Sequence, residues 1–245
     1  MKTLKFILFT CISILFIRCS VVQETIFSED GSGLFSTTVD FSTIGKGLMR
    51  KSSSNETIQK DTTIVFADML EKNKDSISKL PKEQREALYA LRKLTVQMKM
   101  DTVSEQAYIK MDFPFQNINE LNGFYNNIQY VSAKNNPQNI VKDSTMRAFL
   151  GNSYLVNFNS KRFTLTQNKS EAFKKMKDSL QKEHTDEALG NLLNIKIKYT
   201  FPYRIKKISN DKALLSSDFK SFVISAPITD FIKNDIVDTE VEFEK

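Results

Sequence analysis

The chain has 245 residues, of which 40% are hydrophobic and 26% charged, an ordinary composition for a globular protein with a hydrophobic core. The formal net charge of +6 falls to +3 once the three cations of residues 1–18 are set aside, which is too weak and dispersed for a nucleic-acid-binding surface. Both cysteines lie within the first twenty residues and His184 is the single histidine, so we expect no disulfide, no metal site and no cofactor in the rest of the chain.

Residues 1–18 have the pattern of a secretory signal peptide, because two lysines precede an apolar run over residues 6–17. Such a run makes a helix of about 18 Å, shorter than the roughly 30 Å hydrocarbon core of a membrane. Cys19 at its end resembles the cysteine of a bacterial lipobox, although Arg18 stands where that motif has a small residue. The resemblance implies cleavage before Cys19 and acylation of its thiol with palmitate-type chains. An ordinary cleaved signal and an uncleaved anchor remain open as alternatives.

The segment 27–42, FSEDGSGLFSTTVDFS, predicts a β-hairpin. Apolar and polar residues alternate after the glycines, which is typical of a half-buried strand, and Asp30-Gly31 tolerates the positive φ that tight turns need. A phosphate-binding loop would end in Gly-Lys-Ser/Thr before a helix. A calcium loop would have alternating oxygen ligands and a closing Glu. Neither pattern is present, so we interpret the segment as a turn.

Beyond this hairpin, the periodicity of apolar residues predicts helices and further hairpins in turn. We expect a short helix after Ser42, a mobile loop over about 51–61, and a helical region over about 62–93 with a break near Asp75 and a new helix at Pro81. The later elements are hairpin strands over 95–101 and 107–115, a helix over 117–128, a mobile loop over about 132–145, a hairpin over 154–167, a helix within 169–189, and a strand-rich end from residue 194.

Hairpins separated by helices, without a regular βαβ rhythm, predict an α+β fold. We expect a mostly antiparallel twisted sheet with helices packed on one face. Residues 19–245 are expected to form a single domain after the signal peptide of residues 1–18.

The order of these elements resembles a known group of proteins. The cysteine, the DGSG turn, "TTVDFS", the strand "FPYRIKKISN" and the ending "VEFE" resemble envelope lipoproteins of Bacteroidota, and more distantly the LppM-like lipoprotein domain. The resemblance implies an α+β sheet with a hydrophobic groove linked to lipids, and it carries over no catalytic residue. Residues 20–25 have no acidic run of the kind that surface-exported lipoproteins of that group carry, which favours the periplasmic face of the outer membrane.

Three functions are compatible with these patterns. The first is a lipid-anchored, non-catalytic envelope protein that binds or scaffolds an envelope protein or lipid partner. The second is a carrier or receptor for a lipid or other apolar ligand beneath the sheet, although its lining residues also suit an ordinary core. The candidate lining residues are Met98, Met100, Met111, Phe113 and Phe115.

The third function is a hydrolase that uses paired carboxylates, with Asp30, Asp40 and Asp112 as candidates. Such chemistry needs two carboxyl groups about 5 to 10 Å apart in a cleft. The spacing of the three aspartates does not single out a pair, and no Gly-x-Ser-x-Gly motif accompanies His184. We therefore expect a protein that is not an enzyme.

Overall fold

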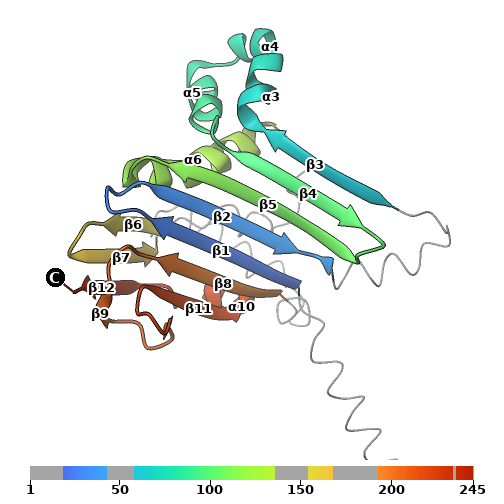
Figure 1. The fold of residues 1–245 in the computed structure, drawn as a ribbon. Coiled ribbons are helices and arrows are strands. Elements are labelled where there is room, and N and C mark those ends of the chain that lie inside the picture. The colour runs from blue at the N-terminus through green and yellow to red at the C-terminus, as the bar shows by residue number, and fades with distance from the viewer. Residues whose placement is uncertain (1–18, 43–57, 136–153, 168–192, 234–235, 245) are drawn as a thin grey trace, which may run out of the picture.

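The computed structural model describes residues 19–42, 58–135, 154–167, 193–233 and 236–244 (Figure 1). The strands in these ranges are β1 (Cys19–Phe27), β2 (Gly33–Asp40), β3 (Gln59–Val65), β4 (Thr95–Asp101), β5 (Gln106–Phe115), β6 (Tyr154–Phe158), β7 (Arg162–Gln167), β8 (Leu193–Thr200), β9 (Ile205–Ile208), β10 (Leu214–Leu215), β11 (Ser221–Pro227) and β12 (Thr239–Phe243). The helices are α3 (Phe66–Lys72), α4 (Lys74–Ser78), α5 (Lys82–Ala90), α6 (Ile118–Asn135) and α10 (Ile228–Lys233).

The strands form two sheets rather than the one sheet that the sequence suggests. The large sheet has eight strands in the order β10-β11-β8-β1-β2-β5-β4-β3, and the small sheet has four in the order β6-β7-β12-β9. Neighbouring strands are antiparallel except β1 and β8, which run parallel. The fold is therefore rich in strands with a few helices, and its large sheet is mixed.

The glycines of the first hairpin have separate roles in the turn between β1 and β2. Gly31 has a φ of 83°, and the turn is closed by the Ser28 N–H, which donates to the Ser32 carbonyl over 2.8 Å. Gly33 gives room: a Cβ there would overlap the carbonyl oxygen of Ile26 and lie 2.5 Å from the Phe115 ring. The predicted hairpin is confirmed, and its composition follows from backbone geometry.

One face of the large sheet carries the core. Along β1, the alternate residues Val21, Gln23, Thr25 and Phe27 are buried, while the residues between them are partly or fully exposed. The small sheet and α6 cover this face: Phe163 of β7 lies 4.8 Å from Tyr199 of β8, measured between ring centroids. On α6, Phe124 packs at 4.3 Å from Phe113. The buried residues of both sheets belong to one continuous hydrophobic core.

α10 contributes Phe231 to that core, whereas α3, α4 and α5 pack largely beside it. The helices α3, α4 and α5 follow the edge strand β3 and stand at one end of the large sheet in Figure 1. Leu70, Ile77 and Leu88 bury one another in a small second cluster, which Val131 of α6 also contacts.

Two boundaries differ from the sequence prediction. β3 occupies residues assigned above to a polar loop and to the first turn of a helix, because the β-branched run Thr62–Val65 pairs with β4 before the helix begins at Phe66. α6 extends to Asn135, into the predicted loop of 132–145. The predicted helices after Ser42 and within 169–189 lie outside the described residues, as does most of the 51–61 loop.

The predicted start of α6 is confirmed by its capping contacts. The Glu120 N–H donates to the Asn117 side-chain oxygen over 3.0 Å, and the Glu120 carboxylate accepts from the Gln116 N–H over 2.7 Å. Lys93 donates to the other carboxylate oxygen of Glu120 at 2.7 Å. These contacts join α6 to the segment that follows α5. Within the described ranges, the helices are too short or too polar to cross a membrane.

Candidate functional site

The three candidate carboxylates of the hydrolase hypothesis lie apart and are engaged locally. Asp30 accepts hydrogen bonds from the hydroxyl and the N–H of Ser32, at 2.6 and 3.0 Å, and the hydroxyl is the main reason its pKa lies below the ordinary value. A turn aspartate with this role stabilises the turn rather than binding a ligand.

Asp40 and Asp112 share the outer face of the large sheet. Asp112 is paired in register with Ser36, whose hydroxyl donates to it over 2.5 Å, and Lys110 forms an ion pair with it at 2.8 Å. Asp40 lies four residues beyond Ser36 along β2, so the backbone positions of Asp40 and Asp112 are about 13 Å apart at strand spacing. That separation is wider than paired-carboxylate hydrolysis uses.

The five candidate apolar lining residues share the core face of β4 and β5, but they differ in burial. Phe113 and Phe115 are 1% and 2% exposed and fill the core. Met111 is partly buried, while Met98 and Met100 are 38% and 40% exposed. Binding of a ligand to these residues stays a prediction.

Cys19, the predicted lipidation site, is the first residue of β1. Its backbone pairs with Leu193 of β8, and the pairing with β2 begins one residue later at Ser20. Cys11 and His184 lie outside the described residues. In the part of the chain that the structure describes, His, Cys, Asp and Glu side chains do not gather in the groups of three that a metal ion needs.

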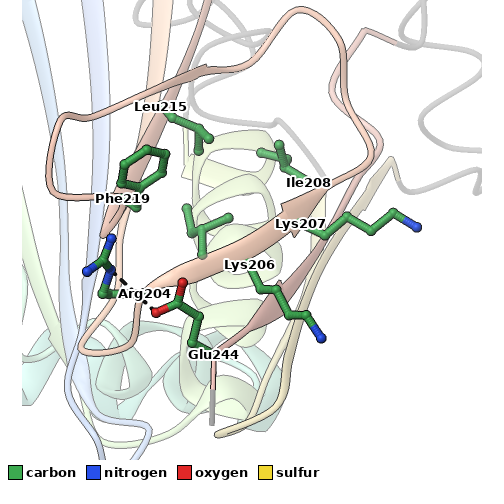
Figure 2. A pocket seen from close by; sticks show the side chains of 8 residues that line it. Arg204, Lys206, Lys207, Ile208, Leu215, Phe219 and Glu244 are labelled. Carbon is green, nitrogen blue, oxygen red and sulfur yellow. Dashed lines mark ion pairs between the residues drawn. The ribbon is translucent and has the colours of Figure 1, made fainter.

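A pocket of about 280 Å³ lies where the edge strands of the two sheets approach one another (Figure 2). β9 is an edge of the small sheet, and β10 is an edge of the large sheet. The loop between β10 and β11 closes the pocket because the Ile205 N–H donates to the Phe219 carbonyl over 2.7 Å. The residues that line it are Arg204, Ile205, Lys206, Lys207, Ile208, Leu215, Phe219 and Glu244.

The pocket combines an apolar group with a basic one. Ile208, Leu215 and Phe219 gather together, while Lys206 and Lys207 extend away from them (Figure 2). Arg204 lies beside Phe219 (Figure 2): it forms an ion pair with Glu244 at 3.5 Å, and its guanidinium carbon is 5.5 Å from the centre of the Phe219 ring. Three cations face one carboxylate, so the lining has a net positive charge.

The sequence analysis missed this pocket. Its β9 residues lie within the "FPYRIKKISN" strand, which was noted above for its resemblance alone, and its other wall comes from a turn, "SSDFKS". A large apolar residue in the middle of a polar turn is the signal that could have indicated it. The approach of β9 to that turn depends on long-range pairing, which this signal does not reveal.

Comparison with known proteins yields one distant similarity. The sequence matches no protein-family model and no curated protein. Among solved structures, the chain is similar to the folded domain of the LppM protein of Mycobacterium tuberculosis, determined by NMR, with 9% sequence identity and a TM-score of 0.39. The match covers 93% of this chain and 91% of that one. Membership of a Bacteroidota lipoprotein group stays a prediction.

Proposed function

We propose that this chain is a lipid-anchored protein of the bacterial cell envelope, attached through Cys19, whose folded part has a non-catalytic binding role. The observation that supports the proposal is that Cys19 itself lies in β1, where its backbone pairs with Leu193 of β8. Cleavage before Cys19 would leave every described β1 pairing intact, because those pairings begin at Cys19 with β8 and at Ser20 with β2. Processing at this point is therefore compatible with the described sheet.

Acylation at this position would hold the sheet close to the bilayer. Two or three acyl chains anchor a protein stably, whereas a single chain does not. Because β1 begins at the acylated residue, a spacer of several residues would not separate the lipid from the sheet. The end of the large sheet where β1 begins and β2 ends would then face the membrane (Figure 1).

A binding role is supported by the contrast between the carboxylates and the pocket. Asp30, Asp40 and Asp112 are separated and held by local hydrogen bonds, which suits structural roles. The pocket between β9 and β10 combines exposed apolar side chains with cations, which suits recognition of a ligand. We further propose the periplasmic face of the outer membrane, since residues 20–25 lack an acidic run.

Metabolic labelling with an alkyne analogue of palmitate tests the anchor. We expect the wild-type chain to incorporate the label, Cys19→Ala to lose it, and the matched control Cys11→Ala to keep it. Equal labelling of the wild type and Cys19→Ala would refute attachment through Cys19, and so would loss of label in Cys11→Ala alone. Protease treatment of intact cells tests the membrane side: a periplasmic protein is protected until the outer membrane is opened.

A further inference from the structure

We propose that the pocket between β9 and β10 binds a soluble, single-chain anionic amphiphile: one aliphatic tail that carries one carboxylate or similar anion. This inference deepens the binding role proposed above, and it rests on the geometry of the pocket rather than on the lipid anchor. The tail would contact Ile208, Leu215 and Phe219, and the anion would contact Lys206 and Lys207.

Phe219 is the residue that distinguishes this pocket from an ordinary surface hollow. It has a φ of 57°, a left-handed conformation that is unfavourable for a bulky residue and that glycine adopts freely. Its side chain is nevertheless 42% exposed, so burial of the ring gives little compensation for that strain. The conformation holds an aromatic ring at the pocket, next to Leu215, which is 38% exposed. The pair presents an apolar surface that a ligand tail can cover.

The charges divide into a fixed part and an available part. Arg204 is held by the Glu244 carboxylate on one side and by the Phe219 ring on the other, so it serves as a wall of the pocket. Lys206 and Lys207 are exposed, and neither forms an ion pair with a carboxylate in the described ranges of the chain. Both lysines extend away from the apolar side chains of the pocket (Figure 2), so their ammonium groups can contact an anion carried by a tail that lies on those side chains.

The size and position of the pocket indicate a soluble ligand with one chain. About 280 Å³ lies just below the roughly 300 to 1,000 Å³ typical of sites for drug-sized molecules, so it is too small for a two-chain lipid. The pocket lies at the end of the sheet where β1 finishes, since Ser221 is level with Thr200 and Ile26. Cys19 is about 23 Å from Ile26 along β1. A site at that distance from the anchor samples the aqueous space rather than the anchoring leaflet.

A photolabel tests the proposal on the full chain in phosphatidylcholine nanodiscs. The probe is decanoate with a diazirine at the end of its tail, and the labelled peptide is identified by mass spectrometry. We expect saturable labelling within residues 205–219 that excess decanoate blocks. Acetate, which lacks the tail, and decyltrimethylammonium, which reverses the charge, should not block it. The protein should be labelled as strongly in nanodiscs of anionic phosphatidylglycerol as in nanodiscs of phosphatidylcholine.

Variants separate binding from folding. Lys206→Gln combined with Lys207→Gln should weaken labelling at least tenfold, the effect of losing about 1.4 kcal/mol of charge-assisted contact. Phe219→Gly should weaken it similarly while the thermal unfolding temperature stays the same or rises, because glycine suits the backbone there. Lys82→Gln, an exposed site on α5, is the matched control and should label like the wild type.

Several results would overturn the proposal: no saturable labelling at residues 205–219, equal competition by decyltrimethylammonium, or full labelling of the lysine and Phe219 variants. Loss of labelling in phosphatidylglycerol nanodiscs would overturn the proposal of a soluble ligand and assign the site to membrane lipid. These outcomes are independent of palmitate incorporation at Cys19, so failure of the pocket and failure of the anchor are distinguishable.

Discussion

Replacement of Gly33 by Ala tests the interpretation of the DGSG segment as a hairpin turn most severely. An alanine Cβ would overlap the Ile26 carbonyl oxygen, a backbone atom held in the β1–β2 ladder, and would meet the buried ring of Phe115 at 2.5 Å. Relief of both contacts requires the two strands to separate locally. Overpacking of this kind costs about 3 kcal/mol, the upper end of the usual range, and the smaller entropy of unfolded alanine offsets about 0.5 kcal/mol of that.

Gly31→Ala is the matched control, because it lies in the same turn and makes the same chemical change. A Cβ at Gly31 meets open space, so the φ of 83° is its main cost, about 1 kcal/mol. With a urea m-value of about 3 kcal/mol per M, Gly33→Ala should lower the denaturation midpoint by about 0.8 M and Gly31→Ala by about 0.3 M. Equal midpoints for Gly33→Ala and the wild type, or a larger loss for Gly31→Ala, would refute the steric reasoning.

Three further predictions concern the core and its supports. Partial burial acts to raise the pKa of Glu120, but hydrogen bonds from Lys93 and a backbone N–H outweigh it and lower that pKa, so the carboxylate stabilises the fold above its unfolded pKa. Glu120→Gln should lower the free energy of unfolding by about 1 kcal/mol at pH 7. Urea titrations should show this difference between variant and wild type vanish as the pH falls through the folded pKa of Glu120. A difference that persists at lower pH would contradict the link between this pKa and stability. Phe163→Ala should lower the free energy of unfolding in urea by about 3–5 kcal/mol, because Phe163 is fully buried. Met98→Ala, at a site that is 38% exposed, should lower it by less than about 1 kcal/mol. The reverse order would show that the core is placed wrongly. The Asn210 amide donates to two backbone carbonyls and one hydroxyl near β12, so Asn210→Ala should lower stability by about 2 kcal/mol and speed hydrogen exchange there, and unchanged exchange would argue against this clamp.

Local patterns predicted the hairpins well because their determinants are short in sequence. Asp30-Gly31 specifies the first turn through hydrogen bonding and positive φ, and Asn159 does the same for the third hairpin by accepting from two backbone N–H groups. The capping contacts of Asn117 and Glu120 were predictable for the same reason. Each of these features involves residues fewer than five positions apart.

The division into two sheets and the pocket were not predictable in this way. β1 pairs in parallel with β8, a partner about 170 residues away, and no local pattern distinguishes that pairing from another. β3 was missed because its β-branched run is followed at once by an amphipathic helix, and the helical period extended over both. The pocket depends on the division into two sheets, since its two walls belong to edges of different sheets.

An anchor at Cys19 would also determine how the structure is oriented in the cell. If Cys19 is acylated, the end of the large sheet where β1 begins lies at the membrane and the pocket lies at the other end. A spacer of ten or more residues would leave this orientation free, whereas an acylated residue that itself lies in a strand restricts it. Binding at the pocket would then be insensitive to the composition of the anchoring leaflet.

Mass spectrometry of the amino-terminal peptide of the mature protein, purified from membranes, tests the central claim most directly. The account predicts a peptide that begins at Cys19 and carries two or three acyl chains. A mature protein that begins at another residue, or whose Cys19 is present and unmodified, would contradict the lipid-anchored function.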